Sequence, residues 1–261
     1  MNMSNSILLP RLIPVALLGL FLTSLPGCLS EESGPLEEGP PRWLFSFDSG
    51  DDGWQPVAAR FSEADRERRN FGFRQVTAQE GTADCCKALQ LEVVSNGRLV
   101  IGMFYPLEGL DPNLLYQGRI RFEVFSDVPA ECGGIPRPPG RDTNFLVGFS
   151  DEQLKPFLTT FDFFQDWWSL NIDHGIPGES GEDAWIVGDF AIDKPCEQPY
   201  RTPGFYWERK RMYNEEPFSF YTDEDGTAWA YILIEPEAEV FPFRFPFDWV
   251  EIEIAEYGEL D

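Results

Sequence analysis

Apolar and polar residues alternate along most of this chain with the two-residue period of a β-strand. Within 119–124, for example, Ile120, Phe122 and Val124 are separated by charged residues. Successive side chains on a strand point to opposite faces, so this pattern predicts strands with one buried face. It recurs in six further segments: 43–47, 89–93, 145–149, 168–172, 228–234 and 250–254. Only 62–69 has a helical pattern. Many strands without intervening helices predict an all-β fold, an antiparallel β-sandwich or jelly roll.

The segment 241–247 predicts an irregularity near the end of the chain. Phenylalanines alternate there with Pro242, Arg244 and Pro246. Proline has no backbone N–H to donate, so the segment is expected at a sheet edge or in a loop. The apolar positions change from odd to even numbers near Asp248, which predicts a bulge or bend at that residue.

The first 27 residues have the organisation of an export signal. A polar start ends at Arg11, and the apolar segment 12–25 that follows carries no charge. This segment is shorter than the roughly 20 residues that a membrane-spanning helix needs. A basic flank, a short apolar core and small residues at its end are typical of a removable signal peptide.

The leader closes with Leu25-Pro26-Gly27-Cys28, which resembles the lipobox of bacterial lipoproteins. In that family the cysteine is lipidated and becomes the first residue of the mature protein. The resemblance implies that Cys28 carries the lipid and that this anchor holds the protein on a membrane of the bacterial cell envelope. Leu29 stands where an Asp would retain the protein at the inner membrane, which favours the outer membrane. Pro26 departs from the family pattern, and an ordinary secretory signal is the alternative.

Composition divides the rest of the chain into a tether and one domain. Residues 29–41 are polar and rich in Pro and Gly, so 28–41 is expected to be a lipidated cysteine with a disordered tether. Residues 42–261 are expected to form a single β-sandwich domain, and a hydrophobic content of 43% is sufficient for its core.

The chain is strongly acidic, with a formal net charge of −25. A negative surface repels phosphate backbones, so nucleic acid is excluded as a partner. It also repels anionic lipid headgroups, so membrane attachment must come from the anchor. The charge has two interpretations: solubility alone, or affinity for Ca²⁺, which prefers several carboxylate oxygens.

Four cysteines remain when the lipidated one is set aside: Cys85, Cys86, Cys132 and Cys196. An even number in an exported chain predicts two disulfides. A bond between the neighbours Cys85 and Cys86 is sterically awkward, so each is expected to pair with Cys132 or Cys196. Zinc is a weaker interpretation, because the cysteines lack paired C-x-x-C spacing and His174 is the only histidine.

Two motifs lie near the ends of the domain. Phe45-Ser46-Phe47-Asp48 runs into Asp51-Asp52-Gly53-Trp54, and 247–252 carries Asp248 shortly before an apolar alternation. Together they resemble a galactose-binding-like jelly roll, the fold of many carbohydrate-binding modules. Acidic groups of the first and last strands often hold a structural Ca²⁺ in such modules. The resemblance therefore implies Asp48 and Asp248 as Ca²⁺ ligands; the alternative is that Asp248 only caps the bend.

Five stretches follow one another in the middle of the chain: 110–116, 133–134, 171–175, 181–189 and 223–229. They resemble a group of bacterial exported proteins for which no activity is established. This resemblance implies a shared fold and export, and it implies no activity.

One acidic strand is a candidate catalytic site. Glu251-Ile252-Glu253-Ile254-Ala255-Glu256 resembles the Glu-x-Asp-x-x-Glu strand of laminarinase-like glycosidases. Carboxylates about 5 Å apart on one strand face could supply a nucleophile and an acid/base. The middle acid is Glu253 and not Asp, and the family needs more chain after the motif. An amphipathic edge strand is therefore the preferred interpretation.

Two further motifs have structural interpretations. His174 is expected to be an ordinary loop histidine, and Asp223-x-Asp225-Gly226 is expected to be a hairpin turn.

The segment 200–213 is the best candidate for an exposed binding loop, because it is rich in Arg and aromatic residues with irregular spacing. Its ligand-binding candidates are Tyr206, Trp207 and Tyr213, with core packing as the alternative. These features predict a non-catalytic envelope lipoprotein that binds carbohydrate or another envelope partner. A glycan-active enzyme using Glu251 or Glu253 and a purely structural envelope protein are the alternatives.

Overall fold

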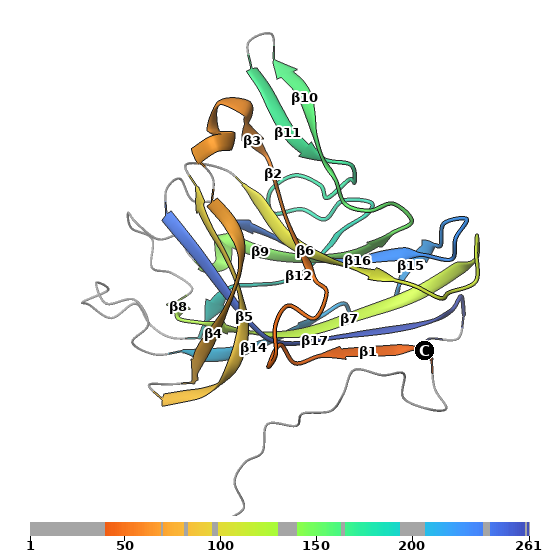
Figure 1. The fold of residues 1–261 in the computed structure, drawn as a ribbon, viewed down its shortest axis with the longest axis horizontal. Coiled ribbons are helices and arrows are strands. Elements are labelled where there is room, and N and C mark those ends of the chain that lie inside the picture. Colours follow the sequence, from red (N-terminus) through yellow and green to blue (C-terminus); the bar gives the residue numbers. More distant parts are fainter. Residues whose placement is uncertain are drawn as a thin grey trace, which may run out of the picture.

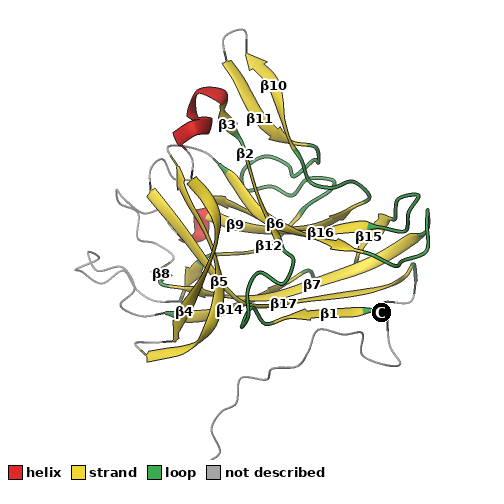
Figure 2. Cartoon of the chain, viewed as in Figure 1, coloured by secondary structure: helices red, strands yellow, loops and turns green. Residues whose placement is uncertain are grey.

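The computed structural model describes residues 40–68, 70–80, 83–95, 99–129, 140–162, 165–193, 207–236, 241–258 and 260. Nearly all of their regular structure is β-strand, arranged as two main antiparallel sheets that pack face to face (Figure 1). The predicted all-β antiparallel sandwich is confirmed. The helical pieces are the short 3₁₀ turns η1 (Glu63–Arg68) and η2 (Gly140–Asp142), drawn red in Figure 2. No helix in this described part is long and apolar enough to cross a membrane.

The larger sheet has seven strands, in the order β14–β7–β17–β5–β4, with β1 beside β17 and β15 beside β7. Its strands are β1 (Arg42–Phe45), β4 (Asn70–Glu80), β5 (Ala83–Ser95), β7 (Leu115–Ser126), β14 (Glu208–Tyr213), β15 (Phe218–Tyr221) and β17 (Phe241–Glu256).

The second sheet has five strands, in the order β12–β9–β16–β6–β2. They are β2 (Gln55–Ala59), β6 (Val100–Leu107), β9 (Thr143–Ser150), β12 (Trp185–Asp189) and β16 (Ala228–Pro236). A small sheet of β10 (Pro156–Asp162), β11 (Gln165–Leu170) and β3 (Phe61–Ser62) projects from the sandwich in Figure 1. A parallel pair, β8 (Val128–Pro129) and β13 (Ala191–Ile192), completes the described strands.

The main core fills the space between the two large sheets. Ile120, Phe122 and Val124 of β7 are fully buried in it, as the alternation in 119–124 predicts. The ring of Phe145 on β9 lies 5.6 Å from that of Phe122 and 5.8 Å from that of Phe245 on β17. Aromatic side chains from both sheets therefore interlock, which stabilises their face-to-face packing.

β16 is buried on both faces. Ile232 and Ile234 belong to the main core, whereas Tyr231 and Leu233 belong to a second apolar cluster. That second cluster also includes Leu154 of the loop after β9, Leu170 at the end of β11 and Ala184 just before β12. Because these segments cover the outer face of the five-stranded sheet, that face is not an open surface.

β17 changes its partners at Asp248. Its first part pairs with β5, and its register against β7 shifts between Phe247 and Trp249. The bulge predicted at Asp248 is confirmed. Before the bulge, the pairing recorded for the described residues 241–246 is with β5 alone, which agrees with the prediction of a sheet edge for this proline-containing segment.

The acidic part of β17 lies inside the sheet. Glu251 is opposite Arg121 of β7 on one side and Leu44 of β1 on the other. The interpretation of this segment as an edge strand is therefore wrong. Its second neighbour is supplied by β1, which is about two hundred residues away along the chain.

Candidate functional site

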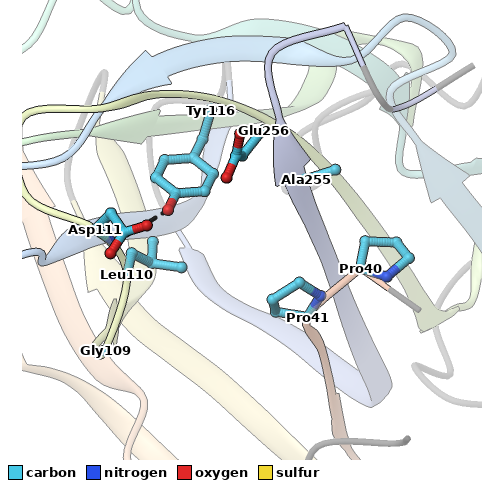
Figure 3. A pocket seen from close by; sticks show the side chains of 8 residues that line it. All are labelled: Pro40, Pro41, Gly109, Leu110, Asp111, Tyr116, Ala255 and Glu256. Atoms are coloured by element: carbon cyan, nitrogen blue, oxygen red, sulfur yellow. Dashed lines mark hydrogen bonds between the residues drawn. The ribbon is translucent and has the colours of Figure 1, made fainter. Parts of the chain in front are cut away.

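Two open pockets lie where β1 begins and β6 ends. The Trp43–Tyr105 pocket has a volume of about 420 Å³ and is lined by Trp43, Asp52, Gly53, Tyr105, Pro106 and Glu108. The Tyr116 pocket has a volume of about 380 Å³ and is lined by Pro40, Pro41, Gly109, Leu110, Asp111, Tyr116, Ala255 and Glu256 (Figure 3). Both use the segments 40–43 and 105–111, so the pockets are neighbours.

Trp43 and Tyr105 are positioned by the sheets that carry them. Trp43 pairs with Ile252 of β17, and Tyr105 pairs with Ala230 of β16. Both side chains pack against the main core and are half-buried, so part of each ring stays accessible. Rings that are already held in place lose little conformational entropy when a ligand stacks on them.

The loop between β1 and β2 closes the pocket around Tyr105. Gly53 has a φ of +89°, and a Cβ at this position would lie only 3.3 Å from Cε2 of Tyr105. Glycine therefore lets the ring lie against the loop backbone. Asp51 accepts a hydrogen bond from the N–H of Gly53 at 3.1 Å, and Asp52 accepts one from the N–H of Phe47 at 3.2 Å. These bonds hold the loop in one conformation.

The pocket has a negative electrostatic character, since Asp52 and Glu108 are its charged lining residues. Burial raises the pKa of Tyr105, and the negative charges of Glu108 and Asp52 raise it further. The Tyr105 phenol therefore stays protonated at neutral pH and can donate a hydrogen bond, whereas the carboxylates of Asp52 and Glu108 can accept hydrogen bonds. The pocket thus combines aromatic surfaces with both donors and acceptors.

The neighbouring Tyr116 pocket is built on a pinned loop. The hydroxyl of Tyr116 accepts a hydrogen bond from the N–H of Asp111 at 3.0 Å, which Figure 3 marks. The carbonyl of Asp111 accepts one from the Thr222 hydroxyl at 2.6 Å, and the N–H of Leu110 donates to the carbonyl of Gly226 at 3.1 Å. The loop after β6 is therefore attached to the connection between β15 and β16.

That connection contains a turn at Asp223-x-Asp225-Gly226, but it joins β15 of the seven-stranded sheet to β16 of the five-stranded sheet. One carboxylate oxygen of Asp223 accepts hydrogen bonds from the N–H groups of Asp225 at 3.0 Å and Thr227 at 2.7 Å. A turn is therefore confirmed at this position, but the prediction of a hairpin is wrong, because the two strands do not pair with each other.

The structure does not bring the two described binding candidates, Trp207 and Tyr213, together. Tyr206 lies outside the described residues. Trp207 is half-buried against Ala78, Ala88 and Phe125. Tyr213 is 47% exposed at the far end of β14, and six residues of strand place the Cα atoms of Trp207 and Tyr213 about 20 Å apart. A shared stacking platform on Trp207 and Tyr213 is therefore not formed, and their individual roles stay predictions.

The candidate catalytic carboxylates are engaged with arginines. Glu251 binds Arg42 at 2.6 Å and Arg121 at 3.3 Å, and Glu253 binds Arg121 at 3.4 Å. This network links β1, β17 and β7 across the outer face of the large sheet. Both candidate carboxylates are therefore engaged in ion pairs within the sheet.

Asp48 and Asp248 have different environments. Asp48 is exposed, and its carbonyl accepts a hydrogen bond from Gln75 at 2.8 Å. Both carboxylate oxygens of Asp248 have protein partners: Cys86 Sγ at 3.2 Å and Arg209 Nη1 at 3.1 Å. The described residues contain no group of three or more acidic, His or Cys side chains arranged to hold a metal. The Ca²⁺ site at Asp48 and Asp248 stays a prediction.

Two of the predicted disulfide cysteines are described, and both carry free thiols. The Sγ atoms of Cys85 and Cys86 are 2.9 Å apart. Cys132 and Cys196 lie outside the described residues, so the pairing of the four cysteines stays a prediction.

His174 lies in a loop, as predicted, but it is buried, which the sequence pattern did not indicate. Its Nδ1 is 2.8 Å from Oε1 of Glu235, and only 8% of the residue is exposed. Arg60 approaches the same oxygen at 3.6 Å.

Trp43 and Tyr105 were not predicted to form a pair. Trp43 lies on the predicted strand 43–47, whereas Tyr105 lies in a segment for which no strand was predicted. In the sequence, 61 residues lie between them. The sequence signal that could have indicated this pocket is the loop motif Asp51-Asp52-Gly53-Trp54. It places two of the lining residues, Asp52 and Gly53, just before a strand.

No protein-family model matches this chain, and no curated protein is similar enough in sequence to match. Among solved structures it is similar to carbohydrate-binding modules from the β-sandwich superfamily, with 10% identity, a TM-score of 0.37 and coverage of 81% of this chain and 61% of theirs. It is also similar to a cleaved adhesin domain of Lys-gingipain from Porphyromonas gingivalis (13% identity, TM-score 0.36, 81% and 97% covered). A third similar structure is a xylan-binding domain from Paenibacillus barcinonensis (13% identity, TM-score 0.37, 85% and 100% covered). The chain thus spans less than two thirds of the first of these structures.

Proposed function

We propose that this chain is a cell-envelope lipoprotein whose β-sandwich binds carbohydrate in the Trp43–Tyr105 pocket without catalysing a reaction. The observation that supports this proposal is the presence of two half-buried aromatic rings in one open pocket with Asp52 and Glu108. Aromatic faces stack on the C–H faces of sugar rings, and carboxylates accept hydrogen bonds from sugar hydroxyls. A mostly preformed cavity with a few polar groups is the usual form of a small-ligand site.

The charge of the region limits the class of carbohydrate. Asp52 and Glu108 line the first pocket, Asp111 and Glu256 line the second, and the whole chain carries −25. Such a surface repels uronic acids and sulfated sugars. The expected ligands are neutral glycans or glycans with free amino groups.

The test is a glycan array followed by calorimetry on the glycans that bind. Trp43→Ala and Tyr105→Ala are each expected to weaken binding by about tenfold, because each removes a stacking surface. Tyr213→Ala is the matched control, since Tyr213 is an exposed aromatic residue on another strand. This control should bind like the unmodified protein, and circular dichroism should show that all three variants are folded.

The other outcomes separate the alternatives. Loss of binding in Tyr213→Ala, with full binding in Trp43→Ala, would move the site to the segment predicted from 200–213. Turnover of a polysaccharide that is abolished by Glu251→Gln would replace the proposal by a glycan-active enzyme. Binding to a protein of the envelope and to no glycan would assign another envelope partner. Repeating the array with a chelator tests whether Ca²⁺ at Asp48 and Asp248 contributes.

A further inference from the structure

β5 contains a β-bulge at two neighbouring cysteines. Its register against β4 shifts between Thr77 and Gln79, so that Cys85 and Cys86 together lie opposite Ala78. The extra residue interrupts the alternation of side chains along the strand. As a result, the two Sγ atoms lie 2.9 Å apart, and Sγ of Cys85 also lies 3.5 Å from the carbonyl oxygen of Ala78.

This geometry brings the two thiols close to bonding distance. A disulfide bond is about 2.05 Å long, so a small movement of the side chains can close it. Adjacent Cα atoms are about 3.8 Å apart, which is shorter than the usual 4.4–6.8 Å across a disulfide. A bond between neighbours is therefore strained, and strained disulfides are the ones that are readily reduced again.

The two thiols have different surroundings. Cys85 is exposed, whereas Cys86 is half-buried and donates a hydrogen bond to Oδ1 of Asp248 at 3.2 Å. Arg209 binds the other oxygen of Asp248 at 3.1 Å. Cys85 is thus the thiol that meets a reagent first, and Cys86 reacts after it.

We propose that Cys85 and Cys86 form a reversible dithiol–disulfide site that is closed by exchange with a low-molecular-weight disulfide such as oxidised glutathione. The bulge supplies the proximity, the exposure of Cys85 supplies the entry point, and Asp248 holds Cys86 beside it. This site is independent of the carbohydrate pocket.

The exchange has two steps. The Cys85 thiolate attacks one sulfur of the small disulfide, which breaks that S–S bond, forms a mixed disulfide and releases the first small thiolate. Cys86 then releases its proton to solvent, and its Sγ attacks Sγ of Cys85. The mixed disulfide breaks, the second small thiolate leaves, and both leaving groups take up protons. The protein loses two electrons and two protons, and the small disulfide is reduced to two thiols.

Peptide mapping of the full chain tests the proposal. The protein is incubated with oxidised glutathione, free thiols are alkylated under denaturing conditions, and the digest is analysed by mass spectrometry. The tryptic peptide 75–87 contains Cys85 and Cys86 and no other cysteine. This peptide is expected as a single species that is not alkylated. Its mass should be lower than that of the dithiol form by two hydrogens, because it contains the Cys85–Cys86 disulfide. Dithiothreitol should return it to the doubly alkylated form.

Two variants test the order of the steps. Cys86→Ser should accumulate a stable mixed disulfide with glutathione at Cys85, because the second thiol is missing. Cys85→Ser should react at least about tenfold more slowly, since the remaining thiol is half-buried and less accessible to the reagent. Neither cysteine lines the two pockets at β1 and β6.

Two results would overturn the proposal. One is a peptide 75–87 linked to a peptide that contains Cys132 or Cys196, which is the pairing expected from the sequence. The other is a doubly alkylated peptide 75–87 after incubation with excess oxidised glutathione. Both readouts are obtained from the same digest.

Discussion

His174 and Glu235 place an ionisable pair beneath the segments that cover the five-stranded sheet. Glu235 is 3% exposed, and its Oε2 is buried without a hydrogen-bond partner among the described residues. Its other oxygen is shared by His174 and Arg60. A buried carboxylate with an incomplete set of partners is costly, so each remaining contact is important for stability.

We expect His174→Ala to lower the free energy of unfolding by about 3 kcal/mol, because it removes the nearest partner of a buried charge. Glu235→Gln should cost less, about 1 kcal/mol, since an amide keeps a hydrogen bond to His174 and needs no counter-charge. Urea unfolding at neutral pH measures both changes. Equal stability of His174→Ala and the unmodified protein would contradict the role assigned to the pair.

At the scale of the strands, sequence pattern predicts what a segment becomes but not which segment it meets. The alternation in 119–124 and 250–254 reports one buried face and is found in β7 and β17. It contains no information on neighbours, so the pairing of β17 with β1 was missed. The bulge at Asp248 could be predicted from the sequence, because a bulge changes the alternation of apolar and polar residues within a single strand. The Trp43–Tyr105 pocket could not be predicted from the sequence, because β1 and β6 belong to different sheets. They come together only through the strands with which each of them pairs.

The contribution of Asp248 to the stability of the folded protein is expected to depend on pH. Burial raises the pKa of Asp248, although the hydrogen bond from Cys86 and the charge of Arg209 lower it. The folded protein therefore holds the proton to a higher pH than the unfolded chain does. This contribution to stability is full below the ordinary pKa of about 3.9 and is lost as the pH rises through the folded-state value.

Asp248→Asn removes this titration. The stability of the variant relative to the unmodified protein is therefore expected to increase as the pH rises from about 3 to about 6. Chemical denaturation at several pH values in this range measures the difference. A relative stability that falls with pH would show that the ion pair with Arg209 dominates over burial.

At the scale of the whole molecule, the proposed binding site lies next to the start of the folded domain. Pro40 and Pro41 line the Tyr116 pocket, and Trp43 lines its neighbour. The carbonyl of Pro41 accepts a hydrogen bond from the N–H of Ile254 at 2.9 Å, which fixes this segment to β17. The predicted disordered tether 29–41 is therefore wrong for its last two residues, which belong to the domain, while 29–39 lie outside the described residues. A tether of this length reaches at most about 45 Å when extended. A lipid on Cys28 would thus hold the pockets near the membrane surface, within reach of glycans of the envelope.

The anchor itself is tested with Cys28→Ser in the full chain, expressed in a bacterium with two membranes. Without the acceptor thiol there is no lipid, and the acidic surface has no affinity for anionic headgroups. The variant should therefore move from the membrane fraction to the soluble fraction and should not incorporate labelled palmitate. Cys85→Ser is the matched control, because it removes a different thiol and should stay in the membrane fraction. Retention of Cys28→Ser in a membrane fraction that detergent releases would show that the chain is held by something other than this lipid.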